Sequence, residues 1–291
     1  MAEYLQLLIS GLATGAIYAL AAIGFTLLWQ TSQTINFAQG EFVMLPAFFA
    51  LVAMKTLGLP FSLAALLAIT MTMLLLGVAF KKIIVDPLIK QGVLPLVIST
   101  IAVALLLKDG VKEFYSAEAQ PFPAILSDKA EAFLGIKISP AQLGVLGVAF
   151  ATIAALQWFL GGTRTGRQMQ ATAQNPTVAR ILGVPVERMV LLTFLINAAL
   201  AAIASLLISP VYLVKFSNGE TLGLVAFVAA IVGGFNQVRG AIAGGLLVGV
   251  IDNFAGYLMP AYRQALPLAL LVVIILFRPQ GLLGRREERT V

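Results

Sequence analysis

Long apolar runs alternate with short polar stretches along the 291-residue chain. A helix that crosses the hydrocarbon core of a bilayer needs about 20 mostly apolar residues. Nine segments approach this length, at residues 5–29, 37–54, 61–80, 92–107, 141–160, 189–213, 220–235, 240–258 and 263–277. The pattern predicts a bundle of membrane-spanning helices. Several segments are short and interrupted by glycine or proline, which indicates that some helices are short or discontinuous.

The composition supports this interpretation. Hydrophobic residues make up 60% of the chain, charged residues 11%, and the mean hydropathy is +0.97. Soluble domains carry about 45–50% apolar and about 25% charged residues. So few charges cannot cover a water-soluble fold. We therefore expect an all-α integral membrane protein with about 8–9 transmembrane helices, in which residues 1–291 form one transmembrane domain.

Several kinds of chemistry are excluded by what the chain lacks. It contains no cysteine and no histidine, which excludes a disulfide scaffold, a zinc site built from those ligands and Cys/His catalysis. No Walker-type phosphate-binding loop is present. We expect no catalytic residues, no metal site and no cofactor, and ATP hydrolysis would have to come from a partner. The net charge of +6 is scattered between apolar runs, so we expect membrane lipid and no nucleic acid as a partner.

The basic residues predict an orientation. They concentrate at residues 81–90, at residues 164–188 and in the tail after residue 277. The positive-inside rule places these regions in the cytoplasm. The stretch 108–140 mixes both charge signs, which favours the outside, and nine spans then put the N-terminus outside. The charged residues used here are Lys81, Lys82, Lys90, Arg164, Arg167, Arg180, Arg188, Arg278, Arg285, Arg286 and Arg289, and Asp109, Glu113, Glu118, Asp128 and Glu131 in the mixed stretch.

Two stretches resemble each other at a constant offset. Residues 37–41 read FAQGE and residues 216–220 read FSNGE. Apolar sequence produces matches of Leu and Ala by chance, whereas this polar match is harder to obtain. We interpret residues 5–107 and 189–277 as two repeat-like halves. The segment between them would invert the second half, as in transporter folds that carry their pathway at the repeat interface.

The polar residues of these stretches are candidates for a substrate pathway, because charged groups within a bilayer are costly and default to functional roles. The alternatives remain open: the two glutamates could instead cap helix N-termini, and the amides could satisfy interrupted backbone. The candidates are Asn36, Gln39, Glu41, Asn218 and Glu220.

A second charged position falls inside the eighth segment. Asp252 either faces a cavity or pairs with Arg239 or Arg263, and pairing is the favoured interpretation. Small residues at helical spacing predict close helix packing. They are Gly11, Gly15, Gly240, Gly244, Gly245 and Gly249.

The polar stretch at about residues 161–188 contains signals for a short helix. Asn175 is suited to the N-cap, Pro176 to the first helical position and Gly183 to the end, where positive φ is required. The pattern predicts a helix over residues 176–182.

This helix is either an ordinary loop helix or a docking element for a cytoplasmic protein. The docking hypothesis assigns it an apolar face of Val178, Ile181 and Leu182, with a basic surround of Arg164, Arg167 and Arg180.

Four stretches carry a family resemblance, in the same order along the chain. Residues 35–42 (INFAQGEF), 170–184 (QATAQNP and ILGV), 223–234 (GLVAFVAAIVGG) and 277–282 (FRPQGL) resemble branched-chain amino-acid ABC transporter permeases of the LivH type. Three residues depart from the family pattern. Gln39 stands where many relatives have histidine, and Pro46 and Ser205 stand where glycine is common.

The resemblance implies a multi-pass subunit of a bacterial inner-membrane importer. Such a subunit moves branched-chain, hydrophobic amino acids by ATP-driven alternating access. Its partners would be two cytoplasmic ATP-binding subunits, a second and related permease in a heterodimer, and a periplasmic substrate-binding protein.

Other functions stay open at this point. Urea and amide permeases belong to the same family, and an ion-coupled secondary transporter would also fit inverted repeats. A passive channel for a small neutral solute would need no docking helix. A membrane-embedded enzyme fits worst, because the sequence shows no catalytic constellation.

Overall fold

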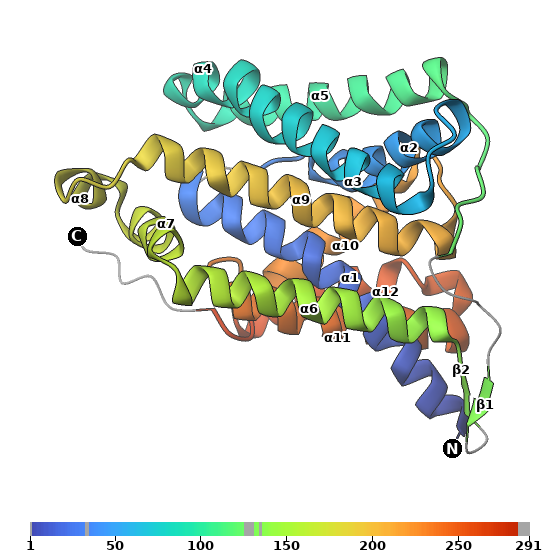
Figure 1. Cartoon of the computed structure of the whole chain (residues 1–291). Coiled ribbons are helices and arrows are strands. Elements are labelled where there is room, and N and C mark those ends of the chain that lie inside the picture. The colour runs from blue at the N-terminus through green and yellow to red at the C-terminus, as the bar shows by residue number, and fades with distance from the viewer. Residues whose placement is uncertain (1, 33–34, 125–130, 134–135, 285–291) are drawn as a thin grey trace. The chain divides into compact units, whose positions relative to one another are not determined.

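The computed structural model describes residues 2–32, 35–124, 131–133 and 136–284 (Figure 1). Asp128, Arg285, Arg286 and Arg289 lie outside these residues. The helices are α1 (Ala2–Ser32), α2 (Gln39–Thr56), α3 (Phe61–Thr72), η1 (Met73–Ala79), η2 (Lys81–Val85), α4 (Asp86–Leu88), η3 (Ile89–Gln91), α5 (Val93–Phe114), α6 (Pro140–Gly162), α7 (Arg164–Gln174), α8 (Pro176–Ile181), α9 (Val186–Tyr212), α10 (Asn218–Gly233), α11 (Val238–Leu258), η4 (Pro260–Tyr262) and α12 (Ala265–Phe277). A short antiparallel pair, β1 (Glu131–Phe133) and β2 (Ile136–Ile138), precedes α6.

The structure confirms an all-α membrane protein. Within the described residues, 6 helical stretches are long and apolar enough to cross a bilayer, and two shorter apolar helices accompany them. The long stretches lie in α1, in the continuous run from α3 to η3, and in α5, α6, α9 and α11, and the shorter ones are α10 and α12. Every predicted apolar segment falls on a helix. The number of qualifying helices is smaller than the number of predicted segments, because α10 and α12 are short and α2 starts with polar residues.

Two stretches that lie outside the predicted apolar segments are helical. The third apolar segment continues through π-helical turns to Gln91, so Lys81 lies in a helix and its Nζ pairs with the carboxylate of Asp86 at 2.6 Å. The fourth segment does not end at Leu107 but runs on to Phe114. Lysine and glutamate are good helix formers. The charged residues therefore indicate where the apolar part of each helix ends, and the helix itself continues beyond that point.

The chain forms two compact units, and three helices, α1, α6 and α10, contribute residues to both. The first unit comprises Met1–Thr26, Ala124–Ala149 and Leu224–Val291, and the second comprises Leu27–Pro123 and Phe150–Gly223. In the second unit, α2 packs against α3, α5 and α9, and α9 also packs against η1.

Glycine contacts bring α1 and α11 together in the first unit. A Cβ atom added to Gly11 would lie 2.8 Å from the Cα of Val250, and one added to Gly15 would lie 2.8 Å from the Cα of Leu246. Neither position accepts a side chain without movement of backbone. The predicted role of these small residues in close packing is confirmed.

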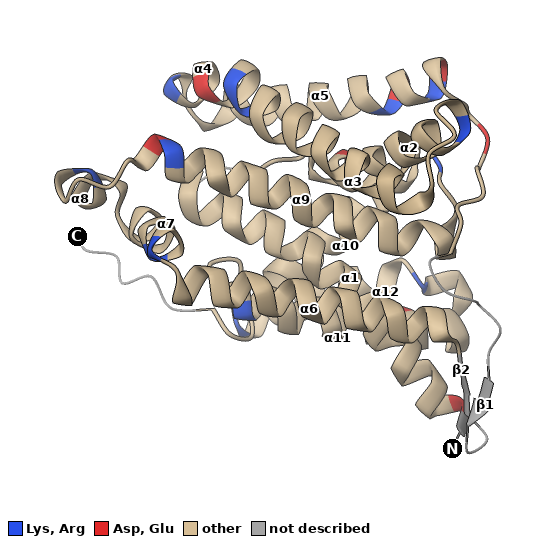
Figure 2. Ribbon diagram, viewed as in Figure 1, with Lys and Arg blue, Asp and Glu red and all other residues tan. Residues whose placement is uncertain are grey.

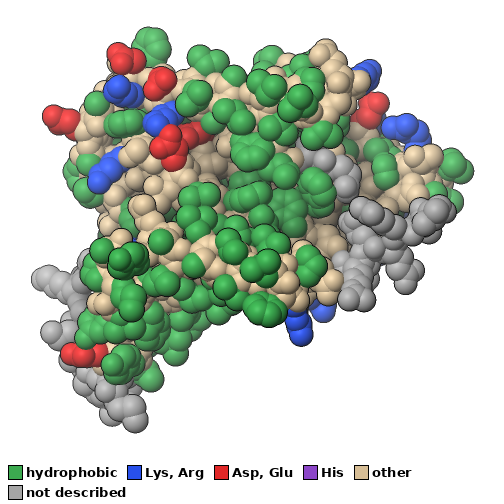
Figure 3. Space-filling model, turned by 180° about the vertical axis from the view of Figure 1, so that it is seen from behind, with side chains coloured by type: hydrophobic (Ala, Val, Ile, Leu, Met, Phe, Trp, Pro, Cys, Tyr) green, Lys and Arg blue, Asp and Glu red, His purple; other side chains and the backbone are tan. Residues whose placement is uncertain are grey.

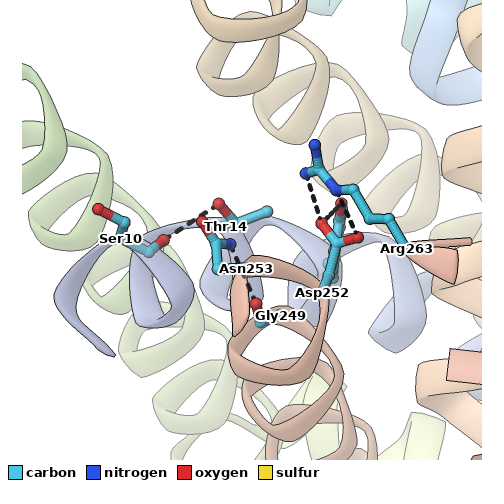
Figure 4. Close-up of polar contacts among 7 residues, drawn as sticks. Ser10, Thr14, Gly249, Asp252, Asn253 and Arg263 are labelled. Atoms are coloured by element: carbon cyan, nitrogen blue, oxygen red, sulfur yellow. Dashed lines mark hydrogen bonds and ion pairs between the residues drawn. The ribbon is translucent and has the colours of Figure 1, made fainter. Parts of the chain in front are cut away.

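Asp252 lies in α11 and forms an ion pair with Arg263, one of the two arginines that the sequence analysis proposed (Figure 4). The Nε and Nη2 atoms of Arg263 donate to its two carboxylate oxygens at 3.0 and 2.8 Å, and the Tyr18 hydroxyl donates to Oδ2 at 3.2 Å. An isolated buried charge is costly, whereas a bidentate pair satisfies both oxygens. Asp252 therefore serves the packing of α1, α11 and the segment before α12.

Large aliphatic side chains are exposed on several helices. On α5 they include Leu94 and Leu106, which are 69% and 72% exposed, and on α12 they include Leu276, at 74%. Figure 3 shows hydrophobic side chains spread widely over one face, with charged side chains gathered in a few places. Such a surface is suited to lipid and not to water.

Basic side chains gather at one end of the second unit. Figure 2 shows them on α7, on α8 and around α4, while the last turns of α5 mix both signs. The same end carries the two short helices α7 and α8, next to the start of α9 (Figure 1).

Candidate functional site

The two similar stretches enter their helices in the same way. A tight turn precedes each helix: the Gln39 N–H donates to the Asn36 carbonyl at 3.2 Å, and the Asn218 N–H donates to the Lys215 carbonyl at 3.1 Å. Gln39 is the first residue of α2, and Asn218 is the first residue of α10. The shared polar sequence therefore has the same local structure at both places.

Hydrogen bonds fix the first turn of α2 to its neighbours. The Phe37 N–H donates to Thr100 Oγ1 of α5 at 3.3 Å. Gln39 and Asn197 of α9 exchange two side-chain hydrogen bonds of 2.7 and 2.9 Å, and both residues are fully buried. This amide pair satisfies its own polar atoms, so Gln39 is held by α9 in this conformation.

A second contact between α2 and α9 compensates for a proline. Pro46 lies inside α2, where proline removes a backbone donor and disturbs the preceding turn. The next residue, Ala47, donates its N–H to Ser205 Oγ at 3.1 Å. A side-chain hydroxyl on a neighbouring helix is a common way to satisfy such a group within a membrane.

The first turns of α2 and α10 touch each other. A Cβ atom added to Gly223 would lie 2.7 Å from the Cα of Gly40, and one added to Gly40 would collide with the carbonyl of Gly219. The Glu41 carboxylate lies directly over Gly219. The glycines of the two stretches therefore let two helix N-termini meet backbone to backbone.

The two glutamates have different surroundings. Glu41 is 3% exposed, and its Oε2 atom has no hydrogen-bond partner within the described part of the chain. The Nδ2 atom of Asn36, which is 4% exposed, also lacks one there. Glu220 has a side chain that is 60% exposed and forms an ion pair with Lys108 of α5. Asn218 is half-buried, and its Nδ2 donates to the Leu213 carbonyl at 2.7 Å.

The predicted pathway residues therefore gather at one junction in the second unit, together with partners that sequence reasoning missed. Asn197, Thr100 and Lys108 were not singled out. Asn197 gave a signal, because it is a single amide within a long apolar segment. Lys108 was placed in the mixed-charge stretch 108–140, outside the predicted helices, so its position on α5 facing Glu220 was not predicted.

The short helix in the polar stretch forms as predicted. Asn175 Oδ1 accepts hydrogen bonds of 3.0 Å from the N–H groups of Thr177 and Val178, and Pro176 is the first residue of α8. Gly183 has a φ of 80° and follows the helix. These local contacts define where α8 begins and ends.

The apolar face of α8 is uncovered. Val178, Ile181 and Leu182 are 48%, 80% and 75% exposed. Arg164, Arg167 and Arg180 are exposed as well, on α7 and α8. The three predicted apolar residues and the three predicted arginines therefore all lie on the surface.

The sequence reasoning missed α7. Thr163 caps it by accepting the Gly166 N–H at 2.9 Å, and Gly166 packs against Phe159 and Leu160, where a side chain would collide with backbone. Arg167 Nη1 donates to the carbonyls of Gly161 and Gly162 at 3.4 and 3.2 Å, at the end of α6. A threonine cap followed by buried Met169 and Thr172 at helical spacing was the available signal.

Comparison with known proteins gives a consistent result. Residues 7–275 match the family described as branched-chain amino acid transport system, permease component. The chain is 32% identical to the high-affinity branched-chain amino acid transport system permease protein BraD of Pseudomonas aeruginosa, covering 99% of this chain and 98% of the relative. It is 30% identical to the protein LivH of Salmonella typhimurium, which has the same description, over the same shares.

A solved structure is similar in fold. PsaBC from Streptococcus pneumoniae, in complex with a Fab, matches with a TM-score of 0.52 and 15% identity, covering 95% of this chain and 92% of that one. At this identity the likeness concerns the fold alone.

Proposed function

This chain belongs to the family of branched-chain amino acid transport permease components, and we propose that it is the membrane subunit of an ATP-driven importer for branched-chain, hydrophobic amino acids. The membrane is a bacterial inner membrane. The observation that carries the proposal is the match to permeases of this description over 99% of the chain. An uncovered, well-capped helix among basic residues supports an ATP-driven type, because a secondary transporter or passive channel needs no docking surface.

The pathway lies at the junction of α2 and α10. Residues 5–107 and 189–277 act as two inverted halves, and their equivalent turns meet at Gly40 and Gly219. Asn36, Gln39, Glu41, Asn218 and Glu220 line the route when the two halves rock apart. Alternating access then consists of parting and rejoining these two helix ends.

The basic end of the second unit faces the cytoplasm. The positive-inside rule supports this orientation, because α7, α8 and the turns around α4 carry basic side chains at one end. Two ATP-binding subunits bind there, and a periplasmic binding protein delivers the amino acid from the other side. A second, related permease completes the membrane part.

The coupling element is α8. Val178, Ile181 and Leu182 enter a groove of the ATPase, and Asn175, Pro176 and Gly183 keep the helix in shape. Arg164, Arg167 and Arg180 surround the contact. Movement of the ATPase is passed through α8 and α7 to α9, against which both helices pack.

Leu182→Asp tests this coupling. Burial of an aliphatic side chain contributes about 1.5–3 kcal/mol, and aspartate would also leave a charge in a dry contact. We expect the variant to insert into the membrane normally while transport and substrate-stimulated ATP hydrolysis both fall. The measurement is ATPase stimulation by loaded binding protein in vesicles that contain the assembled transporter.

Arg180→Ala is the matched control on the same helix. Exposed ion pairs contribute only about 0–1 kcal/mol, so this variant should lose much less stimulation. Full stimulation of Leu182→Asp would show that α8 is not the docking element.

A further inference from the structure

Glu41 is a buried carboxylate with an unused acceptor. It is 3% exposed, and Oε2 has no hydrogen-bond partner within the described residues. An ionised carboxylate has about four acceptor positions. Unpaired buried charges are costly and are kept mainly at functional positions within membranes.

When Glu41 is ionised, the charges of Glu41, Glu220 and Lys108 sum to one negative charge. Glu220 and Lys108 are charged groups near it, and Lys108 is already paired with Glu220. The nearby helix N-termini of α2 and α10 carry partial positive charge but are dipoles, not ions. A small cation that also donates hydrogen bonds would complete this group of charges.

We propose that Glu41 binds the ammonium group of the amino acid in transit. The proposal rests on the proposed function and deepens it, because it makes the permease itself selective for solutes that carry an amino group. An ammonium ion has the required positive charge and donates hydrogen bonds in several directions, including toward Oε2. A neutral amide such as urea, or a carboxylate without an amine, does not supply the missing charge.

The glycine contact controls access to this carboxylate. In the present conformation Gly40 and Gly219 touch, and Glu41 lies over Gly219. An ammonium group therefore reaches Oε2 only when the first turns of α2 and α10 separate. The amide pair of Gln39 and Asn197 is satisfied without a ligand. Asn36 Nδ2 is a donor, so Glu41 Oε2 is the acceptor of this turn that gains an ammonium partner on opening.

The first experiment compares Glu41→Gln, Glu41→Asp and wild type in the assembled transporter, with leucine as the substrate. Loss of a charge-assisted hydrogen bond should lower leucine uptake by Glu41→Gln about tenfold or more. ATP hydrolysis stimulated by loaded binding protein should persist, because α8 is unchanged. Glu41→Asp keeps the charge and should retain intermediate uptake. Glu113→Gln, an exposed glutamate on α5, is the control and should behave as wild type.

The outcomes separate the two proposals. If wild type shows no ATP-dependent leucine uptake, the proposed function is wrong. If wild type transports and Glu41→Gln transports equally well, only the ammonium site is wrong. An equal loss of uptake and stimulated ATP hydrolysis in Glu41→Gln would indicate a structural role for Glu41 and would also overturn the site.

A second experiment needs no variant. The melting temperature of the purified wild-type complex is measured with isopentylamine, with isopentanol, with 4-methylpentanoate and with sodium chloride at matched ionic strength. A ligand that binds the native state raises the melting temperature. Isopentylamine alone should do so. An equal rise with sodium chloride would identify a site for inorganic cations, and no rise with isopentylamine would exclude an ammonium site.

Discussion

The first turns of α2 and α10 have almost the same sequence but place their carboxylates in opposite surroundings. Both follow the same backbone turn, and both carry a Gly-Glu pair in the same positions. Glu41 is 3% exposed and incompletely paired, whereas the Glu220 side chain is 60% exposed and pairs with Lys108. The motif therefore determines the backbone, and neighbouring helices determine the chemistry.

The neighbours explain the difference. The first turn of α2 is covered by α5 and α9, which supply Thr100 and Asn197 as partners. The first turn of α10 is held by the Leu213 carbonyl and by Lys108. A repeat can thus give one half a buried carboxylate and the other half an exposed ion pair.

Gly40→Ala should have the largest effect on this comparison. The added Cβ would meet the Gly219 backbone, with the carbonyl carbon 2.8 Å away, and backbone cannot rotate aside as a side chain can. Overpacking costs typically about 1–3 kcal/mol, and occasionally more. We expect a marked fall in melting temperature and loss of transport, measured on the purified protein and in vesicles.

Gly110→Ala is the matched control for this prediction. Gly110 lies in α5, and a Cβ atom there has no neighbour within 4 Å. Alanine is favoured over glycine in a helix by about 1 kcal/mol, so this variant should be unchanged or slightly more stable. Equal stability of both variants would show that the first turns of α2 and α10 are not in contact in the working protein.

Much of this architecture was predictable from sequence. The positions of the apolar segments predicted the positions of the helices. Asn175, Pro176 and Gly183 predicted α8, because capping interactions are local. Asp252 was expected to be paired, and Arg263 is its partner. Each of these predictions depends on short-range chemistry or on the cost of an isolated charge.

The asymmetry between Glu41 and Glu220 was not predictable, because it depends on which helices cover each turn. The residues that depart from the family pattern illustrate the same limit. Gln39 pairs with Asn197, and the backbone beside Pro46 pairs with Ser205. Both contacts join α2 to α9 over 158 positions of sequence, a distance that local patterns do not bridge.

Asn197→Leu should have an intermediate effect. The substitution removes both partners of the Gln39 amide, which is fully buried. An unsatisfied buried polar group costs about 1–3 kcal/mol. The melting temperature should fall, and the double variant with Gln39→Leu should recover part of the loss because no polar group remains unpaired.

Asn218→Leu supplies the comparison on the α10 side. Asn218 is half-buried, and its side-chain Nδ2 donates to the Leu213 carbonyl, a bond that water can replace. This variant should lose less stability than Asn197→Leu. A larger loss in Asn218→Leu would reverse the ranking of the two turns and would contradict the assignment of α2 as the buried one.

The smallest effect is expected at the ion pair of Lys108 and Glu220. Exposed pairs contribute about 0.2–1 kcal/mol and are weakened by salt, so Lys108→Ala should shift the melting temperature only slightly. Its consequence for Glu41 is of more interest, because Lys108 and Glu220 both act on that carboxylate. Lys108→Glu adds negative charge beside the junction and should disturb the conformation in which Gly40 and Gly219 touch, so leucine uptake should fall. The charge-reversed double variant with Glu220→Lys should restore uptake. Restoration would identify the pair as a unit of the α10 turn, whereas equal loss in the single and double variants would show that Lys108 acts on the pathway without Glu220.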